Sequence, residues 1–319
     1  MNGAGLRAAA CSGNVFLKPT YGVVSRYGTV AVACSGETVS ITADNADTVA
    51  DVLDVLAGHD DKDGTSLPAE ACAKVTRAGA AAAGVAPVTR VVLARGMSDA
   101  ADADTRRLLD AAADALRAQG VTVVETDDAA DAVLAAARPA YNILMSAELC
   151  NNVSRFEGMK YGYHTENYTT IGELYTNSRT EAFGELLKDV ILYGSEVLAT
   201  GNYARCYDKA MRIRRLVCET FARLFADDGA DAGETAGQTA VLLPACSKRA
   251  FTPADVAAAP DLAFTENLFA APALISGLPA LVAGGVQLVG PALSDAALLR
   301  LAGASATAAP SPADGKETW

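Results

Sequence analysis

The sequence predicts an α/β fold, because short apolar strands alternate with amphipathic helices along much of the chain. The best evidence is one strand–helix–strand unit. Residues 91–93 form an apolar strand, residues 102–118 carry apolar side chains at helical spacing, and residues 121–124 form the next strand. Such a unit requires parallel strands and a right-handed crossover. No GxGxxG string follows the first strand, so nucleotide binding is not supported.

The composition is that of a large globular protein. The 319 residues are 51% hydrophobic and 20% charged, which suffices for a sizeable core. The net charge of −12 argues against a general binder of nucleic acid or anionic membranes, although a local basic patch remains compatible with it. No apolar run approaches the roughly 18 residues of a membrane span. No signal-peptide pattern follows Met1, so we expect a cytoplasmic protein without a membrane contact.

The cysteines and histidines predict no metal site. Seven cysteines are present, none in CxxC spacing, and His59 and His164 are the two histidines. We therefore expect no cofactor, and we expect reduced, mostly buried thiols. Residues 59–64 have some features of a calcium loop, but His59 stands where the first carboxylate belongs and Pro68 falls inside the loop. A solvated acidic turn is the prediction there.

Residues 17–32 predict a strand, a turn and a second strand. Pro19 disfavours helix at the residue before it, and Gly22 and Gly28 permit turn conformations. The valines that follow favour buried, extended backbone. They are Val23, Val24, Val30 and Val32. Residues 1–16 are mostly small and are expected to be flexible.

Further helices and strands are predicted from the spacing of apolar residues and from the glycines and prolines that end such segments. Apolar residues between Val49 and Leu56 recur at helical spacing and predict a helix that ends at Gly58. The same reasoning predicts helices at 139–156, 171–178, 180–199 and 202–226, an acidic loop at 227–237, strands at 241–243 and 286–289, and, from composition, a disordered tail at 303–319.

Several strings occur in an order that is specific to one family. They are Leu17-Lys18-Pro19-Thr20-Tyr21-Gly22, Ser25-Arg26-Tyr27-Gly28, Ser154 to Gly162, Arg179 to Gly184, Gly277-Leu278-Pro279 and Gln287 to Gly290. Over about residues 11–301 the chain resembles the amidase-signature family, most closely the A subunits of tRNA-dependent amidotransferases. The resemblance implies an amidase-signature fold with a mixed β-sheet flanked by helices. Residues 1–302 would form a partial domain that lacks the family's N-terminal part.

The resemblance implies a known reaction but not its catalytic residues. Such enzymes use a lysine, a relay serine and a nucleophilic serine, and backbone N–H groups hold the oxyanion. The lysine and the relay serine belong to the family's N-terminal part. The nucleophile belongs to a Thr-Gly-Gly-Ser-Ile-Arg string, whose nearest match here is Asn2-Gly3-Ala4-Gly5-Leu6-Arg7. Ser12 lies beyond that position and is predicted to be a turn hydroxyl, and Lys18 matches a structural lysine. No catalytic residue is predicted.

Two substrate-binding positions map onto this chain through the resemblance. The family's tyrosine is retained as Tyr141, and its ammonium-holding aspartate maps near Asn267. Its carboxylate-clamping arginine maps near Val190, next to a carboxylate that should repel the substrate's own carboxylate. A Gly-Pro-Ile-Thr-Arg string is replaced by residues 40–44, which end in Asp44. Tyr141 also fits the core of a helix, so both interpretations remain open.

Three functional hypotheses follow. The first is a catalytically inactive homologue of the amidotransferase A subunits, which would be a structural or regulatory partner of the B and C subunits and would meet tRNA only indirectly. The second is an incompletely recorded active subunit that supplies ammonia for amidation of Glu-tRNA(Gln) or Asp-tRNA(Asn). The third is an RNA- or protein-binding module that uses the basic segment Arg205–Arg215, which otherwise is a solvated helix face.

Overall fold

The computed structural model describes residues 3–226, 237–259 and 261–305. The chain divides into two compact units. The first comprises residues 1–28, 38–138 and 215–319, and the second comprises residues 29–37 and 139–214. Residues 227–236 of the predicted acidic loop lie outside the described residues. So do residues 306–319 of the predicted tail, whereas residues 303–305 end the last helix.

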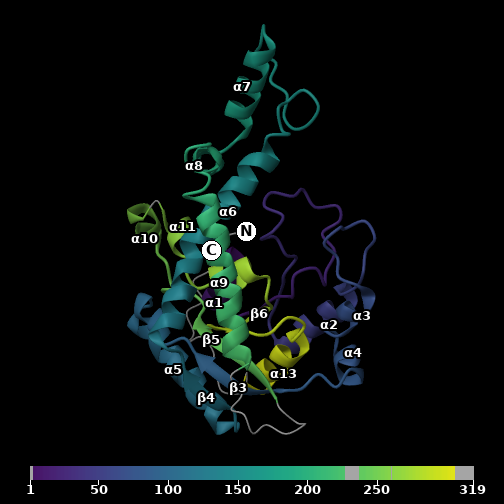
Figure 1. Ribbon diagram of the computed structural model, residues 1–319, viewed down its shortest axis with the longest axis vertical. Helices are drawn as coiled ribbons and strands as arrows, with labels where there is room; N and C mark the ends of the chain where they lie inside the picture. Colours follow the sequence, from purple (N-terminus) through teal and green to yellow (C-terminus); the bar gives the residue numbers. More distant parts are fainter. Residues whose placement is uncertain (1–2, 227–236, 260, 306–319) are drawn as a thin grey trace. The chain divides into compact units, whose positions relative to one another are not determined.

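A mixed sheet of seven strands, counted over the described residues, organises the first unit. Its order is β2-β1-β6-β7-β5-β3-β4. The strands are β1 (Val15–Lys18), β2 (Ile41–Ala43), β3 (Val88–Leu93), β4 (Thr122–Glu125), β5 (Gln238–Pro244), β6 (Ala280–Ala283) and β7 (Val286–Val289). Strand β3 runs parallel to β4 and β5, and every other pairing is antiparallel. The predicted mixed α/β architecture is confirmed (Figure 1).

The predicted parallel unit is β3, α5 (Ala103–Ala118) and β4. Asp102 begins the helix, since its carboxylate accepts a hydrogen bond from the Thr105 N–H at 2.7 Å. Leu109, at 0% exposure, lies on the face of α5 that packs on the sheet. Gly120, with φ +83°, turns the chain back toward β4.

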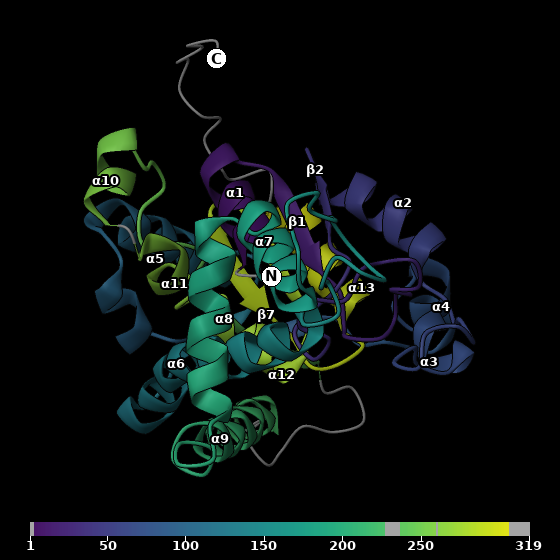
Figure 2. The same ribbon diagram turned by 90° about the horizontal axis from the view of Figure 1, so that it is seen from above.

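The two faces of the sheet carry separate hydrophobic clusters. Side chains alternate along a strand, so neighbouring residues of β1 face opposite ways. Leu17 joins the cluster under α2 (Ala46–Leu56) and α13 (Asp295–Ser305), two helices that pack side by side (Figure 2). Phe16 joins the cluster under α1 (Ala4–Ser12) on the other face.

Two expectations for the first 32 residues were wrong. Residues 4–12 form α1 rather than a flexible segment, because Leu6, Ala9 and Ala10 share one buried helix face. No strand forms at residues 29–33 of the described chain; Val30 is 65% exposed there. Valine favours strands only where a half-buried sheet surface is available.

The second unit is helical. Its elements are α6 (Asp128–Val153, in this unit from Pro139), α7 (Ile171–Ala182), α8 (Glu185–Leu198) and the start of α9 (Tyr207–Ala226). The four predicted helices are present with different bounds: α6 begins eleven residues before Pro139, and α8 and α9 begin at Glu185 and Tyr207 rather than at residues 180 and 202. Pro139 therefore lies inside a helix, at the cost of one backbone hydrogen bond.

Close helix packing holds the second unit together. A Cβ on Gly194 of α8 would overlap the carbonyl oxygen of Ser146 on α6, so only glycine lets these helices approach so closely. A complete capping box begins α7. The Thr170 hydroxyl accepts a hydrogen bond from the Glu173 N–H, and the Glu173 carboxylate accepts one from the Thr170 N–H.

Short helices complete the described chain. They are α3 (Ala69–Ala73), α4 (Arg77–Ala82), η1 (Gly96–Ala100), α10 (Pro253–Ala258), α11 (Leu262–Thr265) and α12 (Ala271–Ser276). Within the described ranges, no helix combines the length and apolar character needed to cross a bilayer.

Candidate functional site

Gly5, which the resemblance maps to the family's nucleophile position, lies in the first turn of α1. Gly3 begins this helix with φ +64°, a conformation that favours glycine. A Cβ on Gly3 would lie 2.5 Å from the Cβ of Ala270, so the start of α1 lies against the start of α12. This contact places the helix start next to the segment that contains Asn267.

The side chain of Phe16 occupies the space beside Gly5. A Cβ built on Gly5 would lie 2.8 Å from Cε2 and 3.5 Å from Cδ2 of the Phe16 ring. Phe16 is 7% exposed and belongs to the cluster under α1. A serine at position 5 therefore requires the ring to move in a packed layer. The sequence alone did not predict the contact between Phe16 and Gly5, because only the packing of α1 on β1 shows which face of the sheet Phe16 occupies.

Neither Ser12 nor Lys18 is arranged for catalysis. The Ser12 hydroxyl donates to the carbonyl of Ala9 at 3.4 Å, an ordinary interaction at a helix end. Lys18 is buried, and its ammonium donates to the carbonyl of Pro19 at 3.1 Å. Burial lowers the pKa of Lys18 to about 8, although the nearby Asp295 carboxylate opposes the shift. Lys18 therefore belongs to the interior of the first unit.

Asn267 is fully buried between α11 and α12. Its backbone carbonyl accepts the N–H of Ala271 at 2.8 Å, which starts α12. The preceding residue, Glu266, accepts hydrogen bonds from the backbone N–H of Ser247 at 3.3 Å and from the Ser247 hydroxyl. The segment is therefore fixed to the loop after β5. The resemblance maps the family's aspartate near Asn267, whose side chain is a neutral amide.

Tyr141 is fully buried in the second unit. A Cβ on Gly36 would lie 3.5 Å from Cε2 of Tyr141, and it would overlap the sulfur of Met145. Hydrogen bonds hold residues 32–35 against α6, among them one from the Ser35 N–H to the Glu148 carboxylate at 3.0 Å and one from the Asn152 amide to the Val32 carbonyl at 2.9 Å. Tyr141 thus lies within the packed interior of its unit.

Tyr141 and Asn267 belong to different units, so the structure describes each within its own unit. Val190, near which the resemblance maps the family's carboxylate-clamping arginine, is 8% exposed on α8. Asp44 is exposed just after β2.

The acidic turn at residues 59–65 is held by internal hydrogen bonds. The hydroxyl of Ser25 donates to Asp60 at 2.6 Å, and the backbone N–H of Arg26 donates to Asp63 at 2.8 Å. Burial raises the pKa of Asp63, but hydrogen bonds from Thr65 and from the Arg26 backbone, together with the Arg26 charge, lower it overall to about 2. The carboxylates of Asp60 and Asp63 therefore stabilise the turn through hydrogen bonds within the protein. Over the described residues, no group of three or more His, Cys, Asp or Glu side chains is placed to hold a metal ion.

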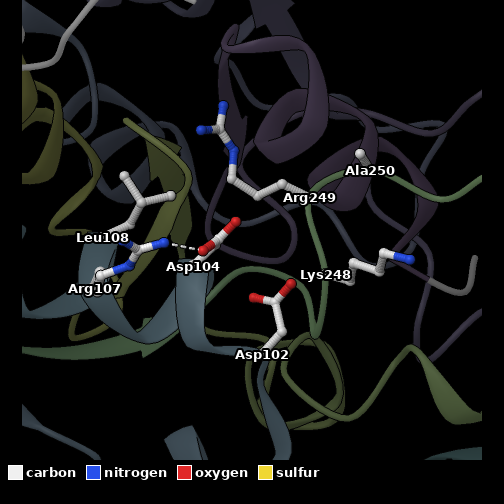
Figure 3. Close-up of a pocket in the computed structure, with 7 residues that line it drawn as sticks. All are labelled: Asp102, Asp104, Arg107, Leu108, Lys248, Arg249 and Ala250. Atoms are coloured by element: carbon white, nitrogen blue, oxygen red, sulfur yellow. Dashed lines mark hydrogen bonds and ion pairs between the residues drawn. The ribbon is translucent and has the colours of Figure 1, made fainter.

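A separate pocket of about 440 Å³ lies at the start of α5. It is lined by Asp102, Asp104, Arg107, Leu108, Lys248, Arg249 and Ala250 (Figure 3). Arg107 forms an ion pair with Asp104, and Lys248 forms one with Asp255 at 2.9 Å. None of the positions mapped from the family lines this pocket.

Comparison with known proteins agrees with the fold. Residues 6–299 match the family described as Amidase. The chain belongs to the amidase family. It is 36% identical over 311 residues to the A subunit of the glutamyl-tRNA(Gln) amidotransferase of Aromatoleum aromaticum, covering 92% of this chain and 60% of that protein. It is 38% identical over 219 residues to the corresponding A subunit of Lachnoclostridium phytofermentans, covering 68% of this chain and 43% of that protein.

Solved amidase-family structures share the fold. The A subunit of the glutamyl-tRNA(Gln) amidotransferase of Thermotoga maritima matches with a TM-score of 0.64 at 20% identity, over 94% of this chain and 59% of that one. A Kluyveromyces lactis allophanate hydrolase matches with a TM-score of 0.69 at 19% identity, over 94% of this chain and 44% of that one. The chain thus spans about 60% or less of these amidase-family proteins.

Proposed function

We propose that this chain is a homologue of the amidotransferase A subunits that has lost amide hydrolysis and has a structural or regulatory role in the cytoplasm. The observation that carries the proposal is the pair Gly5 and Phe16. Gly5 offers no hydroxyl at the nucleophile position, and the ring of Phe16 lies 2.8 Å from the point where a side chain would begin. An acyl-transfer site needs a nucleophile within reach of its base.

Further positions support loss of glutamine binding. Glutamine carries a carboxylate and an ammonium, which a site recognises with charges of opposite sign. At the mapped positions this chain offers buried Val190 and the neutral amide of Asn267. Neither side chain carries the charge of the arginine or aspartate that the family uses there. The chain therefore lacks these two contacts to the charged groups of glutamine as well as the nucleophile.

Exposed apolar side chains in the second unit support a partner chain. Met159, Tyr161, Tyr163, Tyr168, Ile171, Leu186, Leu192, Tyr193 and Tyr203 are between 45% and 68% exposed. Where such side chains form a contiguous patch, they are typical of interaction sites. Subunits of the B and C type are the partners proposed, with tRNA contacted through them.

The experiment measures ammonia release from glutamine and asparagine by the purified chain, alone and with the B and C subunits of the Aromatoleum relative. The Aromatoleum relative itself is the positive control. A second sample joins this chain to the part of that relative which precedes the alignment. We expect no release above buffer from either sample. Release from the fused protein at a rate near that of the control would reject the proposal.

One alternative is that this sequence is part of a longer, active protein. It is favoured by the alignments, which cover only 60% and 43% of the two relatives' own lengths. The discriminating observation is the DNA upstream of the Met1 codon. An in-frame extension that encodes a lysine and two glycine-flanked serines would favour the alternative.

A further inference from the structure

Cys11 and Cys246 come from distant parts of the sequence and meet in the first unit. Cys246 packs in the hydrophobic cluster under α1 together with Ala9 and Ala10, the two residues that precede Cys11, and each thiol exerts the largest influence on the pKa of the other. Cys11 is the penultimate residue of α1, and Cys246 is the second residue after β5. The Nε of Arg249 donates to the carbonyl of Ala10 at 3.3 Å, which fixes the loop after β5 to the last turn of α1.

The two thiols differ in access to solvent. Cys11 is exposed, whereas Cys246 is 0% exposed and lies among the apolar residues under α1. All seven cysteines are described and none forms a disulfide, but the expectation of mostly buried thiols was wrong, since only Cys72 and Cys246 are buried. An exposed thiol beside a buried one matches the usual arrangement of an attacking and a resolving cysteine.

Charges around Cys11 favour its thiolate. The hydrogen bond with Cys246 lowers the pKa of Cys11 most, burial raises it, and the charges of Arg249 and Arg7 lower it, to about 7 overall. Glu266 opposes the shift. The hydrogen bond with Cys11 and burial raise the pKa of Cys246, which therefore keeps its proton. Cationic surroundings of this kind distinguish reactive cysteines from inert buried ones.

We propose that Cys11 and Cys246 form a peroxide-sensitive dithiol, in which hydrogen peroxide oxidises Cys11 and Cys246 completes a disulfide. The Cys11 thiolate attacks one oxygen of hydrogen peroxide. An S–O bond forms as the O–O bond breaks, and hydroxide leaves. The sulfur of Cys246 then attacks the sulfenic sulfur, the S–O bond breaks, and water leaves with the thiol proton. Two thiols become one disulfide while one peroxide becomes two waters.

The disulfide would link α1 to the loop after β5. The same helix carries Gly5 in its first turn, and Glu266 is bonded to Ser247 in that loop. Oxidation would therefore fix the face of the sheet that carries the mapped site. Oxidation of this cysteine pair does not require amide hydrolysis.

The test treats the reduced, desalted chain with hydrogen peroxide at neutral pH, blocks remaining thiols by alkylation, and maps the unreduced digest by mass spectrometry. The expected product is the Cys11 peptide joined to the Cys246 peptide, lighter by two hydrogens than the sum. Cys218→Ser, which removes the other exposed cysteine, should leave this product unchanged. Cys11→Ser should abolish it.

Cys246→Ala should stop the reaction at the Cys11 sulfenic acid, which dimedone traps. The wild-type measurement needs no variant, so a folding defect in Cys246→Ala cannot hide the result. A folded wild-type chain in which Cys11 oxidises without joining Cys246, or no faster than Cys218, would overturn the proposal.

Discussion

The ring of Phe16 on β1 lies against Gly5 on α1, with Cε2 2.8 Å from the point that a Cβ on Gly5 would occupy. Both residues belong to the first unit; Phe16 lies in the hydrophobic cluster under α1, whereas Gly5 is itself exposed on that helix. The contact links Gly5, the residue that the resemblance maps to the nucleophile position, to the packing of the sheet. The stability of a serine at position 5 should therefore depend on Phe16.

We predict that Gly5→Ser lowers the free energy of unfolding by about 1 kcal/mol, because the ring must shift in a packed cluster. In a Phe16→Ala background the same change should raise it by about 0.5 kcal/mol, since serine is the better helix former. Urea unfolding of the four proteins gives the coupling. Ala8→Ser, on the exposed face of α1, is the control. Equal costs in both backgrounds would show that the ring does not restrict position 5.

Asp63 should contribute to the loss of folding stability at acidic pH. Its pKa is about 2 in the folded protein, below the ordinary value of 3.8. The unfolded chain therefore binds more protons between these values, and stability is lost as pH falls from about 4 to 2. Asp63→Asn should flatten this part of the curve and lower stability above pH 4 by about 1 kcal/mol.

Unfolding free energies across a pH series check the prediction. Asp61→Asn is the matched control, because the Asp61 side chain is 96% exposed and exposed ion pairs contribute little. An acid limb that is equally steep in Asp63→Asn and in the wild type would contradict the assignment.

Gly194 should be indispensable to the packing of the second unit. Gly194→Ala should destabilise the protein by about 1–3 kcal/mol, because the new Cβ would overlap the Ser146 carbonyl on α6. Gly172→Ala in α7 is the control, since no atom lies closer than 4.0 Å to its Cβ position. That change should be neutral or stabilising by up to about 1 kcal/mol. Thermal unfolding of both variants decides the matter.

The basic segment at residues 205–215 should not be a nucleic-acid site. Arg212 pairs with Asp208 at 2.6 Å and Arg215 with Glu219 at 2.7 Å, so acidic neighbours on the same helix offset these charges. Arg205 lies before α9 begins at Tyr207. A protein with Arg212→Glu and Arg215→Glu should bind a generic RNA as weakly as the wild type across a salt series. Loss of salt-dependent binding in the variant would restore the third hypothesis.

Local pattern predicted much of the fold. The unit β3-α5-β4 follows from apolar spacing, a capping aspartate and Gly120, all of which act within a few residues. The early start of α6 was missed because Pro139 suggested a first helical residue, whereas it lies within the helix. The second strand expected near Val30 failed because no neighbouring strand pairs with it in the described chain.

The candidate site was less accessible to sequence reasoning. The resemblance mapped Tyr141 and Asn267, and the structure shows that both are fully buried. Whether either contacts a substrate stays a prediction. The contact of Phe16 with Gly5 and the pairing of Cys11 with Cys246 depend on strands and helices that meet across long sequence separations. No local pattern encodes them.

The central claim is that this amidase-family chain no longer breaks amide bonds. The most direct measurement is ammonia release from glutamine by the fused protein, which carries the preceding part of the Aromatoleum relative, assayed with the B and C subunits. We predict a rate equal to the buffer blank, in the wild type and in Gly5→Ser, where Phe16 still restricts the position. A glutamine-dependent rate near that of the Aromatoleum relative, from the fused protein with Gly5 unchanged, would contradict the account.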